Sequence, residues 1–298
     1  MYFLTDLERK LLRSKILPYT RQNQVDEGLR GWNWHEEPLR PYYDETRLPM
    51  YEVNSKYCPT GRDVYLMHVE GRKPKLGFKV GLGKLIHGVV SDQLISFIEG
   101  RELSFEDWWK RVKWNEIPGG DPERMRPYAH SVWSHLKRLY EARLTEVSLR
   151  QPYAHQRDLI ASAAPFLIEH KMSGSLLGLS DYISVDCYDY LHCIMFDLKV
   201  EFEEALPWHR LAPTGYALVF ESLHEVPIDV GCVVYVRFLK NGKLRVQKDL
   251  FPITNELRNE WVAERDNKLE IVAKAKDPGK PQRSECYPDC GFYGCCWG

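Results

Sequence analysis

The hydrophobic pattern of the chain changes near its middle, and this change constrains the fold more than any other feature of the sequence. The first half carries apolar residues at helical spacing, which predicts helices at residues 80–98, 104–114 and 121–149. Short segments rich in apolar and β-branched residues then predict strands at residues 166–169, 175–185 and 192–201. This order indicates an α/β protein with a helical half and a central mixed sheet flanked by helices.

The last third of the chain adds a helix, a hairpin and a second helix. Residues 208–223 have helical spacing, and residues 256–276 predict a charged surface helix. Between them, residues 232–239 and 244–250 flank Asn241-Gly242, a dipeptide suited to a tight turn. We therefore expect a β-hairpin at this point.

Composition and charge indicate neither a membrane protein nor a general affinity for nucleic acid. The 298 residues are 28% charged and 44% hydrophobic, which is enough for a real core. Lys and Arg total 41 against 42 Asp and Glu, so any nucleic-acid contact must come from a local patch. No apolar run approaches the roughly 20 residues of a membrane helix, and the charged start is unlike a signal peptide. We expect a cytoplasmic protein without a membrane partner.

The cysteines are distributed unevenly along the chain. Of eight, Cys58 is alone in the first half, whereas the last thirteen residues hold Cys286, Cys290, Cys295 and Cys296. Clustered thiols in a reducing compartment more often bind a metal or perform redox chemistry than form disulfides. Cys58-Pro59 is expected at the start of a helix. No function is assigned to the cysteines in or beside the predicted strands, Cys187, Cys193 and Cys232.

Two carboxylates and a lysine in the predicted sheet suggest a hydrolytic site. Gly178-Leu-Ser-Asp181 is expected on one strand, and Phe196-Asp197-Leu-Lys199 near the end of the next. Carboxylates at adjacent strand ends can share a hard divalent cation, and a lysine two residues along a strand points to the same face. Such a metal would bind phosphate oxygens and activate water, while Lys199 would orient that water or stabilise the developing charge.

An Asp-x-Lys triplet alone is a common pattern, and without other support a solvated strand edge would explain it better. Two further residues support the site: His87 on the apolar helix upstream, and Tyr216 on the helix that follows the Asp-x-Lys strand. For His87 the alternative is a hydrogen-bonded core histidine. For Tyr216 it is an ordinary core aromatic.

The order of these motifs resembles the RecB-like nucleases of the PD-(D/E)xK superfamily. One cysteine in Lys56-Tyr-Cys-Pro59 and three at the C-terminus resemble the iron–sulfur subset of those nucleases. Within that subset the chain is most similar to the CRISPR-associated Cas-four family, specifically its archaeal Csa-one branch. Gly31-Trp-Asn-Trp34 and Tyr57-Cys-Pro-Thr-Gly-Arg-Asp-Val-Tyr65 carry this similarity, which covers nearly the whole chain.

The resemblance implies a RecB-like nuclease core and a set of site residues. The expected divisions are an N-terminal arm (1–57), a nuclease domain (58–285) with a helical insert at about 100–150, and a cysteine-rich tail (286–298). Mg²⁺ or Mn²⁺ would be bound by His87, Asp181, Asp197 and the backbone carbonyl of Leu198. Catalysis would use Asp181, Asp197, Lys199 and Tyr216.

The chain departs from the family pattern at two positions. Ala212 stands where the family's Gln-x-x-x-Tyr helix has glutamine, which puts substrate positioning in doubt. Asp197 replaces the more common glutamate but still offers an oxygen ligand, so we treat it as compatible with activity.

The resemblance further implies a [4Fe–4S] cluster. Its ligands would be Cys58, Cys286, Cys290 and Cys296; the family's spacing selects Cys296 over Cys295. Such a cluster would tie Cys58 to the tail and close a very long loop of chain. A tetrahedral four-cysteine zinc site uses the same residues, and spacing does not separate the two.

The function implied is a metal-dependent DNA exonuclease. It would cut single-stranded ends or overhangs of spacer precursors during CRISPR spacer acquisition, with the integrase subunits as partners. One alternative is an inactive nuclease-fold scaffold that binds DNA and the integrase, as the missing glutamine at Ala212 would suggest. A zinc-stabilised DNA-binding protein without catalysis is the other.

Two local patches are candidates for contact with DNA. The better one precedes His87 and carries five cations without an acid, namely Arg72, Lys73, Lys75, Lys79 and Lys84. The other, residues 108–114, interleaves tryptophans with cations as a stacking surface for single strands would. An amphipathic helix with buried tryptophans and solvated lysines explains the second patch better.

Overall fold

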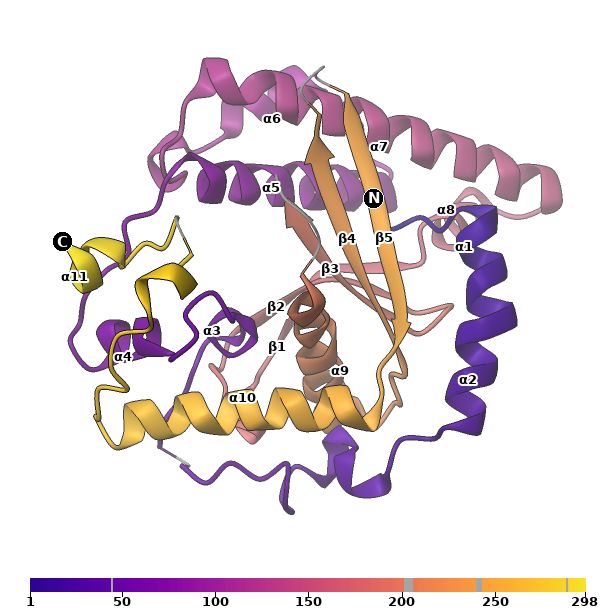
Figure 1. Cartoon of the computed structure of the whole chain (residues 1–298). Helices are drawn as coiled ribbons and strands as arrows, with labels where there is room; N and C mark the ends of the chain where they lie inside the picture. Colours follow the sequence, from indigo (N-terminus) through magenta and orange to yellow (C-terminus); the bar gives the residue numbers. More distant parts are fainter. Residues whose placement is uncertain (44, 201–205, 240–242, 288) are drawn as a thin grey trace.

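A computed structural model describes residues 1–43, 45–200, 206–239, 243–287 and 289–298 (Figure 1). At its centre lies one five-stranded sheet with the strand order β1-β2-β3-β4-β5. The strands are β1 (Phe166–Met172), β2 (Ile183–Asp189), β3 (Ile194–Val200), β4 (Val230–Phe238) and β5 (Leu244–Pro252). Only β3 and β4 are parallel among these strands, and the other neighbours are antiparallel. The predicted mixed sheet is confirmed.

The parallel pair is possible because a helix connects its strands. Antiparallel neighbours can be joined by a tight turn, whereas parallel strands need a longer crossover. Here the short helical turn η6 (Pro207–Arg210) and the helix α9 (Leu211–His224) lie between β3 and β4. This crossover covers the residues predicted to be helical at 208–223, and it places α9 against the sheet.

Successive side chains of a strand point to opposite faces of the sheet, so the core has two layers, one on each face. Ile194, Phe196 and Leu198 of β3 pack with the first layer, whereas Met195 packs with the second. The first layer is completed by α5 (Phe78–Ile98), α6 (Phe105–Arg111) and α7 (Pro122–Arg150), and α8 (Gln156–Ala163) packs against α7 and α5. Figure 1 shows α5 and α7 side by side along one side of the sheet. The helices α5, α6 and α7 match the predicted ones within a few residues, whereas α8 was not predicted.

The second layer lies between the sheet and helices from both ends of the chain. It contains α9, α10 (Asn255–Ala273) and the short helix α3 (Met50–Asn54). Trp261 of α10 is fully buried there, and its indole N–H donates to Asn54 Oδ1 at 3.0 Å. The N-terminal part of the chain is therefore fixed to the penultimate helix.

The first residues of the chain contribute to the core. Met1–Leu4 are buried in the first layer, and a helical segment follows as α1 (Asp6–Leu11), η1 (Leu12–Ile16) and α2 (Leu17–Gln22). Two short 3₁₀ turns follow: η2 (Glu27–Leu29) contacts α10, and η3 (Gly31–Asn33) crosses α9. A Cβ at Gly31 would lie 2.1 Å from the Leu218 carbonyl oxygen, so only glycine fits this crossing.

The tail lies beside a helix of the first half. Helix α4 (Arg62–His68) begins four residues after Cys58, and the tail forms η7 (Arg283–Glu285) and α11 (Tyr293–Trp297). Figure 1 shows α11 and α4 next to each other at one edge of the molecule. Leu66 of α4 packs with Phe292 and Cys296 in a small separate core.

One predicted strand is wrong in its first part. Residues Ser175–Leu177 form the 3₁₀ turn η5, Gly178 follows with φ +72°, and β2 begins only at Ile183. Gly178-Leu-Ser-Asp181 is therefore a turn that leads into the strand. The predicted Asn241-Gly242 hairpin turn lies outside the described residues, although β4 and β5 pair on both sides of it.

Among the described residues, no helix combines the length and the apolar character that crossing a bilayer requires.

Candidate active site

The candidate site lies where two strands of the sheet separate. β2 and β3 pair from Asp189↔Ile194 to Cys187↔Phe196. At the next position the backbone N–H of Leu198 donates to the side chain of Asp186, with 2.6 Å between N and Oδ2. A carboxylate therefore takes the place of a backbone acceptor, and the opening between the strands is lined by acidic side chains.

His87 enters this opening from helix α5. Its Nδ1 lies 3.3 Å from Oδ1 of Asp186, and its Nε2 lies 2.9 Å from the carbonyl oxygen of Leu198. His87 directly follows the core residue Ile86 on α5, so its side chain is rotated away from the buried face and lies at the margin of the first core layer. The Leu198 peptide thus contacts Asp186 through its N–H and His87 through its carbonyl.

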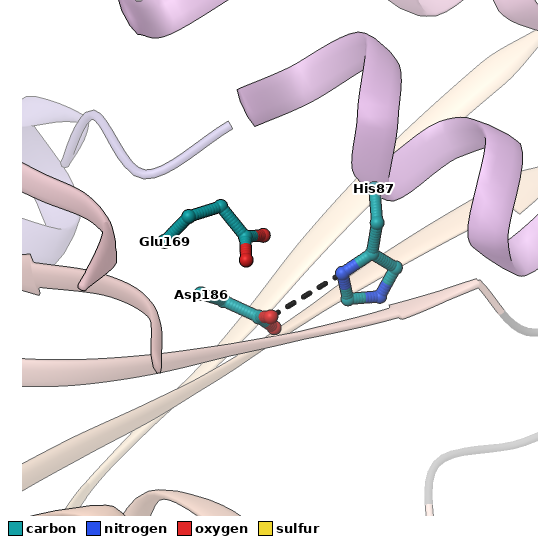
Figure 2. Close-up of side chains that lie close together, drawn as sticks. All are labelled: His87, Glu169 and Asp186. Atoms are coloured by element: carbon teal, nitrogen blue, oxygen red, sulfur yellow. Dashed lines mark ion pairs between the residues drawn. The ribbon is translucent and has the colours of Figure 1, made fainter. Parts of the chain in front are cut away.

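Glu169 of β1 completes a close group of possible ligand atoms. One atom each of His87, Glu169 and Asp186 lies within 4.8 Å of the others. Figure 2 shows the Glu169 and Asp186 carboxylates close together, with the His87 ring facing Asp186. Glu169 has φ +50°, which is rare for a residue with a side chain, and Ser184 donates a hydrogen bond to its carboxylate. Backbone strain of this kind is concentrated at functional sites.

Asp197 and Lys199 lie on β3 beside this group. Because strand side chains alternate, both point to the same face, and Lys199 Nζ lies 3.0 Å from Oδ2 of Asp197. Asp197 is 3% exposed. Among the described residues its buried Oδ2 accepts no hydrogen bond of good geometry, which leaves a lone pair that a cation could use.

The charged side chains of the site shift one another's pKa values. Burial alone would lower the pKa of His87, but the charges of Asp186 and then Asp197 raise it to about 9. Burial raises the pKa of Asp197 to about 6, assisted by the Asp186 charge and opposed by Lys199. Burial also acts to raise the pKa of Asp186, yet the opposing effect of His87 prevails and lowers it. At neutral pH the site has paired carboxylates facing one imidazolium and one ammonium group.

Tyr216 of α9 packs partly buried against the second core layer. Burial raises the pKa of its hydroxyl well above the usual value, and the charges of Asp186, Asp197 and Glu169 raise it further. Ala212, one helical turn earlier, is buried in the core. The structure therefore brings His87, Asp197, Leu198 and Lys199 together, whereas Tyr216 is related to them only through the charges of the carboxylates.

Asp181 does not join them, and the position expected for it is occupied by Asp186. Asp181 lies exposed in the bend before β2, because the Gly178 turn ends there. Asp186, in the middle of β2, is the carboxylate that contacts His87 and Leu198. This placement corrects the expected position of Asp181 at a strand end beside Asp197.

Sequence reasoning missed both Asp186 and Glu169. A usable signal existed for Asp186, since an ionisable residue interrupts the apolar run Val185-Asp-Cys187 of a buried strand, where it needs a partner. Glu169 offered no comparable signal. Its orientation depends on a positive φ that no residue in its neighbourhood indicates.

The donor set fits a hard divalent cation. Imidazole nitrogen, carboxylate oxygens and a backbone carbonyl are the ligands of Mg²⁺ and Mn²⁺ sites. The residues that could hold the ion are His87, Asp186, Asp197 and the Leu198 carbonyl, with Glu169 as a further oxygen donor. Nε2–H of His87 donates to the Leu198 carbonyl oxygen at 2.9 Å, so a cation that replaced this proton would meet both atoms.

The four predicted cluster cysteines lie around a separate cavity. Cys58, Cys286, Cys290 and Cys296 all line it, and Cys295 is not among its lining residues. Two of the sulfurs accept hydrogen bonds, from Trp297 Nε1 to Cys286 at 3.2 Å and from Arg62 Nη1 to Cys296 at 3.3 Å. Convergent thiols with N–H donors suit a metal or iron–sulfur centre, where such bonds stabilise the ligand charge.

The better of the two predicted DNA patches lies partly beside the cysteine-rich tail and partly along α5. The backbone N–H of Lys75 donates to the Gly291 carbonyl, and Lys79 pairs with Asp289. Arg72 pairs with Glu70, Lys84 Nζ donates to the Glu116 carbonyl at 2.9 Å, and Lys73 is exposed. Lys84 lies one turn before His87 on α5, which is the position of this patch nearest the carboxylates.

The second patch is part of the helical core, as expected for an amphipathic helix. Trp108 of α6 is 6% exposed and donates from its indole N–H to Asp92 at 2.8 Å. Phe105 stacks on Trp109, and the short turn η4 (Trp114–Glu116) brings Trp114 against Trp109.

Comparisons with known proteins agree over the whole chain. A family model described as CRISPR-associated exonuclease Csa1 matches residues 1–298. A protein of Saccharolobus solfataricus with that description is 31% identical over 300 residues, which cover 99% of both chains. A Thermoproteus tenax protein with the same description is 28% identical over 308 residues, again covering 99% of both.

Proposed function

Because the chain belongs to the Csa1 family of CRISPR-associated exonucleases, we propose that it is a metal-dependent DNA exonuclease with a RecB-like core. The observation that carries this proposal is the convergence of His87, Asp186, Asp197 and Lys199 at the opening between β2 and β3. These residues come from a helix and two strands, and they bring two basic and two acidic groups together. The substrate is a phosphodiester at a single-stranded DNA end.

The proposed roles follow from the chemistry of each side chain. His87, Asp186, Asp197 and the Leu198 carbonyl hold Mg²⁺ or Mn²⁺, with Glu169 as an additional donor. Such an ion supplies Lewis-acid stabilisation of the phosphate and water that is nucleophilic at neutral pH. Lys199, held 3.0 Å from Asp197, orients that water or stabilises charge on the phosphate. Hydrolysis forms one P–O bond to water and breaks the P–O bond to the leaving oxygen, which takes up the proton.

Tyr216 is a positioning residue in this account. Its helix packs on β3, and its hydroxyl lies in the field of the site carboxylates. The adjacent Ala212 offers no polar group where the family pattern has glutamine. We infer that substrate is positioned without that amide.

We further propose that Cys58, Cys286, Cys290 and Cys296 hold a [4Fe–4S] cluster. Support comes from the shared cavity and the N–H···S bonds of Arg62 and Trp297. The cluster would connect the tail to the loop before α4 and so restrain a long loop of chain. Its role is structural, and zinc is the competing occupant.

The biological setting we propose is CRISPR spacer acquisition. Precursor ends would be trimmed before the integrase subunits insert them, and those subunits would be the protein partners. The competing function is an inactive scaffold that binds DNA and the integrase. Ala212 favours that scaffold, whereas the assembled carboxylates and Lys199 favour an enzyme.

One experiment separates enzyme from scaffold. Anaerobically purified protein is incubated with end-labelled single-stranded DNA, with and without Mn²⁺, beside the Asp197→Ala and Lys199→Ala variants. The enzyme predicts metal-dependent shortening of the DNA that both variants lose while they still bind it. Equal cleavage by the variants would refute the site, and DNA binding without cleavage by the unmodified protein would favour the scaffold.

A further inference from the structure

A second cavity, of about 440 Å³, lies apart from the carboxylate residues. It is formed where α1 and η1 meet the C-terminal part of α7 and the turn between β2 and β3. Arg9 of α1 lies 3.7 Å from Glu146 of α7, and Figure 1 shows α1 on the side of the molecule where α7 ends. Its lining includes five cations, Arg9, Lys10, Arg13, Arg143 and Arg150. We call this the basic cavity.

A single glutamate holds three of these arginines together. Glu146 lies 2.5 Å from Arg143, 2.7 Å from Arg150 and 3.7 Å from Arg9, measured between side-chain nitrogen and oxygen. Hydrogen bonding from Arg143 lowers the pKa of Glu146, so the glutamate stays charged. Arg9 also pairs with Asp6. Two carboxylates thus face five cations, which leaves an excess of positive charge in a concave surface.

Two of the cations are available to a ligand. Lys10 and Arg13 are exposed, and within the described part of the chain neither forms an ion pair. Ser14 adds a hydroxyl to the lining. A polyanion gains most from such a surface, because each phosphate that it places there releases condensed counterions, and guanidinium groups suit phosphate oxygens.

The basic cavity is connected to the candidate active site by a short hairpin. His192 lines the cavity and lies in the turn between β2 and β3, the strands that carry Asp186 and Asp197. Five positions separate His192 from Asp197, which is about 17 Å along an extended strand. A nucleic-acid strand with one phosphate at the carboxylates could therefore place a neighbouring part of its backbone in the cavity.

We propose that the basic cavity binds the phosphate backbone of single-stranded DNA at a distance from the cleaved bond. The proposal rests on the proposed function, because it takes the same DNA strand as the ligand. It adds a distal subsite in which Lys10, Arg13 and Arg150 contact phosphates and Glu146 positions the arginines. This subsite contributes to affinity for the strand and takes no part in bond breaking.

Charge reversal at the two unpaired cations tests the subsite. The Lys10→Glu/Arg13→Glu double variant of the full chain is compared with Arg21→Glu, an exposed cation on α2 outside the cavity lining. Binding of a labelled 25-nucleotide single strand is followed by fluorescence anisotropy, with EDTA present, across a series of salt concentrations. We expect the Kd of the double variant to rise at least about tenfold at low salt. The slope of log K against log salt should fall by about 1.4, which corresponds to two lost phosphate contacts.

Cleavage kinetics with Mn²⁺ provide the second readout. Loss of a distal contact should raise KM and leave kcat unchanged, since the contact is equal in ground and transition states. Binding by the double variant that equals that of Arg21→Glu would overturn the subsite, as would a fall in kcat at unchanged KM. If the unmodified protein binds DNA and does not cut it, the proposed nuclease function fails, while the binding comparison still decides on the subsite.

Discussion

Nδ1 of His87 lies 3.3 Å from Oδ1 of Asp186, although the first residue belongs to a helix of the N-terminal half and the second to a strand of the sheet. The backbone N–H of Leu198 reaches the other oxygen of the same carboxylate. Asp186 therefore joins α5, β2 and β3 at one point. Its charge raises the pKa of His87 to about 9, so the imidazole is held as a cation where a metal ion can replace the proton.

A buried carboxylate, Glu221, holds the N-terminal segment that contains Gly31-Trp-Asn-Trp34 against α9. Glu221 of α9 is fully buried, accepts two hydrogen bonds from Arg258 at 2.7 and 2.8 Å, and pairs with Arg30 at 3.0 Å. Glu221→Gln removes the charge that pairs with the fully buried Arg258, whereas Arg30 keeps Asp229 at 2.6 Å. We predict a loss of about 3–5 kcal/mol in the free energy of unfolding.

Chemical denaturation provides the measurement for this variant, and Glu225→Gln provides the control. Glu225 lies one helical turn later and is exposed, so its substitution should change stability by less than about 0.5 kcal/mol. Equal stability of the two variants would show that the ion pairs of Glu221 with Arg258 and Arg30 do not hold the N-terminal segment on α9.

A buried histidine away from the candidate ligands should make stability depend on pH. His209 is 1% exposed and contacts the Tyr235 hydroxyl at 3.2 Å. Burial, assisted by the Lys199 charge, lowers its pKa from 6.5 to about 3. Between these values the unfolded chain binds a proton that the folded chain does not bind. Stability therefore falls as pH decreases from 6.5 toward 3, by up to about 1.4 kcal/mol per pH unit.

His209→Gln should remove this contribution while its amide can still reach Tyr235. Urea unfolding at pH 7, 6, 5 and 4 measures the free energy of unfolding for both proteins. We expect the free energy of unfolding of the variant to depend less steeply on pH. Over this range, the variant should take up about one proton fewer on unfolding. Parallel curves would contradict a neutral, buried His209.

The two adjacent cysteines of the tail should behave differently. Cys296 lines the cavity with Cys58, Cys286 and Cys290, and its sulfur accepts a hydrogen bond from Arg62. Cys295 is outside that lining, and it interacts with the exposed Arg72. We predict that Cys296→Ser abolishes bound iron, whereas Cys295→Ser retains it.

Visible absorbance and iron content of anaerobically purified protein check this prediction. A brown protein with about four iron atoms per chain supports the cluster, while a colourless protein that contains zinc supports the alternative, since Zn²⁺ has no d–d absorbance. Iron retained in Cys296→Ser and lost in Cys295→Ser would reverse the ligand choice.

The fold could be predicted largely from local pattern. Helical periodicity located α5, α7 and α9, and β-branched segments located β1, β3 and β4, because each buries one face or one layer against neighbours. The helical segment at residues 6–22 was not predicted. The chain around it packs against elements that are distant in the sequence, so the local pattern does not show it. Met1–Leu4 fill the first layer only because α5 and the sheet leave space for them.

The site could be predicted only in part. His87, Asp197, Lys199 and Tyr216 were identified because their order and spacing follow a known motif, and the structure brings the first three together. Asp181 was chosen because Gly-x-x-Asp precedes a strand. The structure uses that glycine for a turn with φ +72° and supplies Asp186 from within the strand. The point at which β2 and β3 stop pairing is a tertiary feature, and no local pattern encodes it.

The most direct test of the account compares two aspartates five residues apart. Asp186→Asn keeps an acceptor for the Leu198 N–H but removes the charge beside His87, and Asp181→Asn changes an exposed residue in a bend. Mn²⁺-dependent shortening of end-labelled single-stranded DNA is measured for both, with circular dichroism as a check on folding. The account predicts a loss of at least about 10²-fold in rate for Asp186→Asn and an unchanged rate for Asp181→Asn. An active Asp186→Asn protein beside an inactive Asp181→Asn protein would contradict it.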